Sequence, residues 1–178
     1  MNDPLPTDDA SARESVSLST LVDRLARHIS EAGPGDVAAL RRLRPGSPQV
    51  GAYWKLLATV LEPADRLPGE VGAREEAERR WAVILAAMAE AEGFHAPNAK
   101  LGRVLAECGV PEVRVLKLLR ASGDALADAV RVTVHHLVSR GARFDQTAIA
   151  ALVLSDGDAH EERVRRGIYR DFFGAQGA

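Results

Sequence analysis

Apolar residues recur at helical spacing along almost the whole chain, and glycine and proline interrupt the pattern at short intervals. In the first such segment, Leu18, Leu21 and Leu25 fall on one helical face, and Gly33 follows where the helix should end. Similar faces predict helices over residues 36–43, 48–61, 73–92, 98–109, 111–122, 124–140, 145–153 and 158–173. About nine helices and no convincing strand pattern predict an all-α fold.

Several of these helices carry specific expectations. The inward face of the 48–61 helix should include Tyr53 and Trp54, and the inward face of the last helix should include Phe172 and Phe173. The β-branched run from Val130 to Val134 is the one place where a strand could be argued, but its flanks favour a helix. Candidate N-terminal caps are Asp36, Asn98, Asp145 and Asp158.

The chain divides into three parts. Residues 1–15 are polar and contain two prolines but no periodicity, so we expect a disordered tail. The segment 93–97 contains Gly93 and Pro97 and interrupts the helical pattern. We therefore expect an N-terminal helical bundle over residues 16–95 and a C-terminal helical bundle over residues 96–178.

The formal charge argues against a protein that coats nucleic acid through bulk charge. Lys and Arg number 23 and Asp and Glu number 25, a net charge of −2, so we expect the isolated chain to bind nucleic acid weakly. The balance is uneven, however, because residues 1–40 hold seven acids and three bases. Residues 41–55 hold four bases and no acid, and residues 98–145 hold eight bases against five acids. These positive stretches are either binding patches or ordinary solvated helix faces.

The search for catalytic and metal-binding motifs is negative. The chain has no glycine-rich phosphate loop, no Gly-x-Ser-x-Gly elbow and no His-Glu-x-x-His pair. His135 and His136 are adjacent, so on a helix they point in different directions, one to the core edge and one to solvent, and cannot share a metal. The single cysteine, Cys108, excludes an intrachain disulfide and is expected to be a small buried hydrophobe. We expect a protein that is not an enzyme and has no cofactor and no metal.

The apolar segments and the start of the chain suggest where the protein works. No apolar run approaches the roughly 20 residues needed to span a bilayer. The first residues are acidic and lack the basic start and apolar stretch of a signal peptide. We therefore expect a cytoplasmic protein without a membrane partner.

Residues 101–120 have some features of a helix-turn-helix. Gly109 falls at the turn, and the second helix carries Arg114, Lys117 and Arg120. Leu105 stands four residues before the turn glycine, where such a motif needs a small residue, and the second helix has few side chains that read base edges. Arginines that are not accompanied by amide side chains for reading base edges are suited to contacting phosphates, with no preference for sequence. A helix-turn-helix DNA-binding regulator and a purely structural helical adaptor remain the alternatives.

A series of short motifs carries a family resemblance. In chain order they are Arg41-Arg42, the segment 53–57, Leu101 to Ala106, Leu118 to Ala121, Ser139-Arg140-Gly141 before Phe144-Asp145, and Arg163 to Phe173. Together, over about residues 18–174, the series resembles the CasB family, the small subunit of the type I-E CRISPR effector complex called Cascade.

The resemblance implies a non-catalytic, all-α subunit that works in antiviral defence. Members of this family lie as a head-to-tail pair in the complex, so the implied partners are a second copy of the chain and the other Cascade subunits. They contact the backbone of the CRISPR RNA–target DNA and the displaced non-target strand, and they stabilise the R-loop. Sequence recognition belongs to the guide RNA. Because the exchange of DNA pairing for RNA–DNA pairing is nearly balanced in free energy, modest contacts to the backbone can shift it towards the R-loop.

Residue by residue, the resemblance and the basic stretches predict eight nucleic-acid-binding arginines: Arg41, Arg42, Arg44, Arg103, Arg120, Arg131, Arg163 and Arg166. Three departures from the family pattern bear on the C-terminal bundle. Val132 replaces the second arginine of an Arg-Arg pair that begins at Arg131, and His135 stands where another base is common. Gln146 replaces the usual tryptophan after Asp145. We expect the basic surface to shift towards residues 163–166, including Arg165. For each arginine the alternative is a solvated side chain or a partner for an acid one helical turn away.

Overall fold

The computed structural model describes residues 16–44 and 50–177, and this part of the chain is built from helices. The α-helices are α1 (Leu18–Ser30), α2 (Pro34–Arg41), α3 (Gly51–Leu56), α4 (Val71–Glu90), α5 (Leu101–Glu107), α6 (Glu112–Arg120), α7 (Gly123–Ser139), α8 (Thr147–Leu154) and α9 (Glu161–Gln176). A π-helical turn, η1 (Leu57–Leu61), continues α3. The all-α prediction is confirmed, and the run from Val130 to Val134 lies inside α7. The expected tail over residues 1–15 lies outside the described residues.

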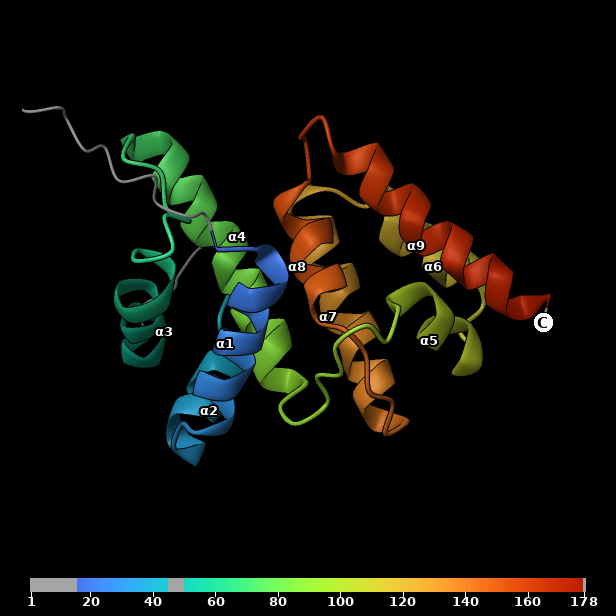
Figure 1. Cartoon of the computed structure of the whole chain (residues 1–178), viewed down its shortest axis with the longest axis horizontal. Helices are drawn as coiled ribbons and strands as arrows, with labels where there is room; N and C mark the ends of the chain where they lie inside the picture. Colours follow the sequence, from blue (N-terminus) through green and yellow to red (C-terminus); the bar gives the residue numbers. More distant parts are fainter. Residues whose placement is uncertain (1–15, 45–49, 178) are drawn as a thin grey trace, which may run out of the picture.

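Helix α4 is the centre of the arrangement (Figure 1). It packs against α1 and α2 on one side and against α7 and α8 on the other. Its buried residues include the large apolar side chains Trp81, Ile84, Leu85 and Met88, which belong to the hydrophobic core. Beyond α7, α6 packs on α7 and α5 packs on α9. The division into bundles at residues 95 and 96 stays a prediction, and α4 gives the two expected halves a common packed surface.

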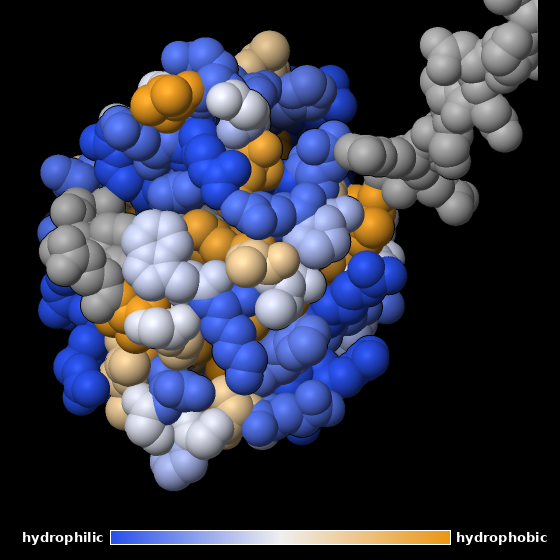
Figure 2. Space-filling view, turned by 90° about the vertical axis from the view of Figure 1, so that its left-hand side faces the viewer, coloured by the Kyte–Doolittle hydropathy of each residue, from blue (hydrophilic) through white to orange (hydrophobic). Residues whose placement is uncertain are grey.

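The segment over residues 48–61 differs from its prediction in two ways. Helix α3 begins at Gly51, and Pro48 lies outside the described residues. Tyr53 is fully buried and its hydroxyl donates to the backbone carbonyl of Glu78 at 2.7 Å, whereas Trp54 is 46% exposed. The prediction of an inward Trp54 was wrong, because the next residue on a helix is turned by about 100° from a buried neighbour. Figure 2 shows the face of the molecule that lies on the left in Figure 1, the side on which α3 lies. On this face, hydrophilic residues surround small, separate apolar patches.

None of the four predicted cap residues is the N-cap of its helix, but Asp145 and Asp158 accept backbone N–H groups close to a helix start. The Asp145 carboxylate accepts the backbone N–H of Thr147, at 2.9 Å, at the start of α8. The Asp158 carboxylate likewise accepts the backbone N–H of His160, at 2.8 Å, just before α9. Asp36 instead lies inside α2, and Asn98 lies two residues before the N-cap of α5. Phe173 is also only half-buried, whereas Phe172 is fully buried as expected. One further cap was not predicted: the Glu70 carboxylate accepts N–H groups of Gly72 and Ala73, and these hydrogen bonds lower its pKa.

A junction clamp joins residues 93–99 to residues 144–146. Phe144 donates its N–H to the carbonyl of Phe94 and accepts the N–H of Ala96, both at 3.0 Å. His95 Nδ1 accepts the N–H of Gln146 at 3.2 Å, so the proton lies on Nε2, which donates to Asp23 of α1 at 2.8 Å. Gln146, only 3% exposed, donates from its side chain to the carbonyl of Ala91 at 2.9 Å. The clamp therefore ties α1 and the end of α4 to the start of α8.

Candidate nucleic-acid interface

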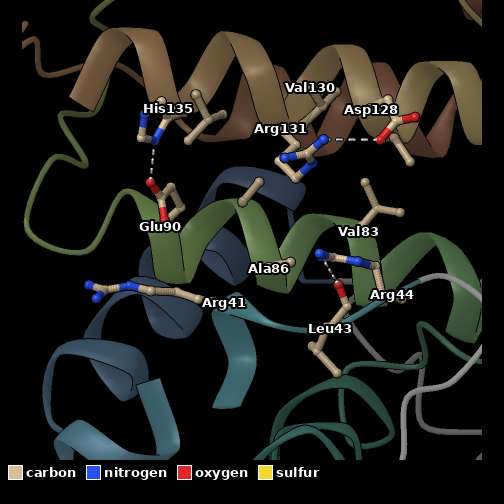
Figure 3. Close-up of a pocket in the computed structure, with 13 residues that line it drawn as sticks. Arg41, Leu43, Arg44, Val83, Ala86, Glu90, Asp128, Val130, Arg131 and His135 are labelled. Atoms are coloured by element: carbon tan, nitrogen blue, oxygen red, sulfur yellow. Dashed lines mark hydrogen bonds and ion pairs between the residues drawn. The ribbon is translucent and has the colours of Figure 1, made fainter. Parts of the chain in front are cut away.

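Three of the eight predicted arginines line one groove, which encloses about 240 Å³ (Figure 3). The groove lies between the end of α2, the second half of α4 and the middle of α7. Arg41 and Arg44 come from the first half of the sequence, and Arg131 comes from α7. Figure 3 shows Arg44 and Arg131 on opposite sides of the groove, with Val83 and Ala86 of α4 between them. Positions from distant parts of the sequence thus meet at one surface.

Each groove arginine is held differently. Arg41 donates from Nε to the carbonyl of Ala89 at 2.9 Å and pairs with Glu92 at 3.1 Å, so it also joins α2 to the end of α4. Arg44 donates to the carbonyl of Leu43 at 3.3 Å. Arg131 lies 3.4 Å from Asp128, and both side chains are more than half exposed, so this ion pair is weak. Arg44 and Arg131 are therefore the two guanidinium groups most available to a ligand.

The chemistry of the groove suits phosphate better than base edges. Its floor consists of short apolar side chains, among them Ala86, Ala87 and Val130. Its acids are Glu90 and Asp128, and Glu90 accepts a hydrogen bond from the exposed His135 at 2.9 Å. None of its described lining residues carries an amide or hydroxyl side chain. A guanidinium group can donate two parallel hydrogen bonds to the oxygens of one phosphate. Reading of base edges relies on amide side chains as well as arginine, and this groove has no amide side chain among its described lining residues.

The other five predicted arginines lie elsewhere on the surface. Arg42 is exposed directly after α2 but does not line the groove. Arg103 of α5 is 68% exposed and pairs with Glu107 at 2.8 Å, which raises the pKa of Arg103 further above its ordinary value. Arg120 is exposed at the end of α6, and Arg163 and Arg166 are exposed on α9. The structure thus separates the eight predicted positions into a groove and several outer helix faces.

Arg165 is a structural residue, in contrast to the expected role in a basic surface. Its side chain is only 15% exposed and pairs with Glu161 at 2.8 Å and with Asp156 at 3.4 Å. It also donates to the carbonyl of Ala121 at 2.8 Å, so it joins α9 to the turn between α6 and α7. Its neighbour Arg166 is 75% exposed and pairs with the equally exposed Glu162.

The contrast between these neighbours can be measured. We expect Arg165→Met to lower the free energy of unfolding by about 2 kcal/mol, because Asp156 and Glu161 are left without a partly buried partner. Arg166→Met should change it by less than about 0.5 kcal/mol, because an exposed i, i+4 pair contributes little. Urea unfolding followed by far-UV circular dichroism gives both values. Equal effects of the two substitutions would contradict the structural role of Arg165.

Helices α5 and α6 do not reproduce the packing of a helix-turn-helix unit. Helix α5 packs mainly on α9, and α6 packs mainly on α7. Gly102 of α5 lies so close to α9 that a Cβ atom there would stand 2.1 Å from the carbonyl oxygen of Ile168. The glycine of the Leu-Gly-Arg motif thus serves helix packing. Cys108, at the end of α5, is half-buried where full burial was expected, and this burial raises the pKa of its thiol.

The sequence interpretation missed Arg170 and the pairing of His135 with Glu90. Arg163, Arg166 and Arg170 follow one another at helical spacing, and this pattern could have identified Arg170. No sequence signal indicates that Glu90 and His135 are neighbours, because α4 and α7 meet only through tertiary packing. The described residues contain no group of three or more side chains that could hold a metal ion. Within residues 16–44 and 50–177, no helix is long and apolar enough to cross a bilayer.

Comparisons with known proteins give concordant results. The family model described as CRISPR-associated protein Cse2 matches residues 36–173. A crystal structure of Escherichia coli Cascade bound to a PAM-containing double-stranded DNA target contains a chain that is 20% identical, with a TM-score of 0.66 over 87% of this chain and 95% of that chain. CasB from Thermobifida fusca is 25% identical, with a TM-score of 0.67 over 87% of this chain and 97% of that chain. No curated protein matches the sequence.

Proposed function

The chain belongs to the CRISPR-associated protein Cse2 family, and from this premise we propose how its surface works in the complex. It is a small subunit of a type I-E CRISPR complex. In our proposal the subunit is non-catalytic, and its groove holds a nucleic-acid backbone without sequence preference. These contacts stabilise the R-loop while the guide RNA supplies recognition.

The observation that carries this proposal is the meeting of Arg41, Arg44 and Arg131 at one groove. Arg44 and Arg131 offer guanidinium donors that the protein itself uses little. A phosphate placed between them would accept charge-assisted hydrogen bonds from both sides. Such contacts release counterions from the nucleic acid, and they carry no sequence information.

The proposed partners are the other Cascade subunits, a second copy of the chain, the CRISPR RNA–target DNA backbone and the displaced strand. The similarity to a chain of a Cascade complex bound to double-stranded DNA supports the first and third of these. A net charge of −2 gives little long-range attraction, so neighbouring subunits must bring this chain to its nucleic acid. We place this assembly in the cytoplasm.

Omission of the subunit from a reconstituted complex tests the proposal. We expect R-loops on two unrelated guide–target pairs to lose stability by a similar factor, because the subunit binds the backbone and ignores sequence. The slope of log affinity against log salt should become shallower by about 0.9 for each duplex phosphate that the complex no longer binds. Filter binding over a salt series measures both quantities. A structural adaptor would leave the slope unchanged, and a helix-turn-helix regulator would affect one target far more than the other.

A further inference from the structure

Helix α9 carries basic and aromatic side chains on one exposed side. Arg163, Arg166 and Arg170 are spaced three and four residues apart, so they lie along one side of the helix. Tyr169 and Phe173 are four residues apart and lie beside this row. We refer to these five residues as the α9 stripe. The arginines are exposed, and the two rings are half-buried.

The two rings form a firm aromatic pair. Their centroids are 4.5 Å apart with an interplanar angle of 56°, and the fully buried Phe172 packs edge-on against Phe173 at 5.4 Å. The Tyr169 hydroxyl lies 3.3 Å from a carboxylate oxygen of Glu112, at the start of α6. These contacts fix the rings in place while part of each remains open to solvent. An ordered, partly exposed ring pair offers a stacking surface at little cost in side-chain entropy.

The charge around the rings favours an anionic ligand. Among the three acids of α9, Glu161 pairs with Arg165 and Asp171 pairs with Lys100, so only Glu162 is left to pair with the stripe, at Arg166. Arg163 and Arg170 have no ion-pair partner among the described residues. Arg120, at the end of α6, lies near enough to Tyr169 to oppose the rise in its pKa that burial causes. The acids that contact the stripe are thus Glu112, at Tyr169, and Glu162, at Arg166. Four arginines face these two acids, so a surplus of positive charge remains around the rings.

We propose that the α9 stripe binds single-stranded nucleic acid. Bases of an unpaired strand stack on the exposed parts of Tyr169 and Phe173, and Arg163 and Arg170 hold the adjacent phosphates. Unpaired bases have free faces, whereas bases inside a duplex are already stacked on each other, so the rings select a single strand. An acidic protein could pair with the arginines of the stripe, but it has no bases to stack on Tyr169 and Phe173. The inference rests on the proposed function, since a single strand is already among the proposed partners, and it adds a second surface with a ring pair on which the bases of that strand stack.

Photocrosslinking of the full chain tests the site directly. A single-stranded oligonucleotide containing 5-iododeoxyuridine would be bound at low salt and irradiated, and the crosslinked peptides would be identified by mass spectrometry. We expect crosslinks at Tyr169 or Phe173. Tyr169→Leu with Phe173→Leu should weaken binding of an oligo-dT strand by about tenfold or more, because the bases can no longer stack on the rings. Affinity for duplex DNA of the same length should change less than about twofold.

Matched variants separate stacking from folding. Tyr169→Phe with Phe173→Tyr keeps both rings and should keep single-strand affinity, with circular dichroism confirming the helix content of every variant. Crosslinks that avoid α9 would overturn the inference even if the leucine variant fails to fold. Equal weakening of single-strand and duplex binding would also overturn it. Arg44→Ala with Arg131→Ala should leave the ring crosslinks in place, so a failure of the groove proposal is distinguishable from a failure of this one.

Discussion

Replacing Arg44 and Arg131 with alanine is expected to shorten the lifetime of the R-loop in a reconstituted complex by about tenfold or more. Each guanidinium–phosphate hydrogen bond contributes about 1.5–3 kcal/mol, and about 1.4 kcal/mol corresponds to a factor of ten. R-loop formation is nearly balanced, so the weakening is not hidden by a large surplus of pairing energy. Arg41 should be left intact, because its bond to Ala89 also holds α2 against α4.

The lifetime can be followed as the release of a labelled non-target strand from a stalled complex after dilution. The matched control is Arg24→Ala with Arg27→Ala, which removes two exposed positive charges from α1, outside the groove. The control should leave the lifetime within about twofold, because bulk charge contributes little at physiological salt. Equal effects of the two double variants would show that net charge matters and the groove does not. Size-exclusion chromatography of each complex confirms that the subunit is still incorporated.

Gly102→Ala is expected to destabilise the chain strongly for so small a change. The new Cβ would stand 2.1 Å from the Ile168 carbonyl oxygen and 2.8 Å from the Phe172 nitrogen. Both are backbone atoms of α9, so α5 and α9 must move apart. Overpacking costs about 1–3 kcal/mol or more, and the better helix propensity of alanine returns only up to about 1 kcal/mol. We expect a net destabilisation of about 2 kcal/mol, which lowers the unfolding temperature by roughly 4–8 °C.

Gly167→Ala is the matched control for this substitution. Gly167 lies inside α9, and an added Cβ would meet no heavy atom within 4 Å apart from its chain neighbours and the adjoining backbone of α9 itself. The same change should therefore stabilise the chain by up to about 1 kcal/mol through helix propensity alone. Thermal unfolding at fixed protein concentration, followed by circular dichroism, should give shifts of opposite sign. A neutral or stabilising Gly102→Ala would mean that α5 and α9 do not approach as closely as described.

The helices could be predicted from the sequence because apolar spacing and glycine or proline breaks act locally. Helix α4, for instance, was expected over residues 73–92 and is found at Val71–Glu90. The orientation of single side chains was harder. Trp54 was placed inward because it is apolar, yet the tighter packing went to Tyr53, whose hydroxyl finds a backbone acceptor. Apolarity ranks residues for burial, but the turn of the helix decides which of two neighbours is buried.

The candidate site was predictable in its residue types and not in its grouping. The basic stretch over residues 41–55 made Arg44 a candidate and the family resemblance made Arg131 one, but only the packing of α4 between α2 and α7 brings them to one groove. Neighbours in sequence also diverged, because Arg165 turns into an ion-pair network while Arg166 faces solvent. A glycine such as Gly102 shows its importance only when the opposite helix is in view. These properties depend on packing between distant segments, which no local pattern records.

The junction clamp has a consequence for how the helices can move. Hydrogen bonds from His95, Phe144 and Gln146 tie the start of α8 to α1 and to the end of α4, although these segments are far apart in the sequence. Gln146 is only 3% exposed, so separating α8 from α4 would leave its side-chain N–H and the carbonyl of Ala91 without their hydrogen-bond partners in a buried place. Leaving buried polar groups unpaired is costly. We therefore expect α1, α4 and α8 to move together rather than as parts of two independent bundles.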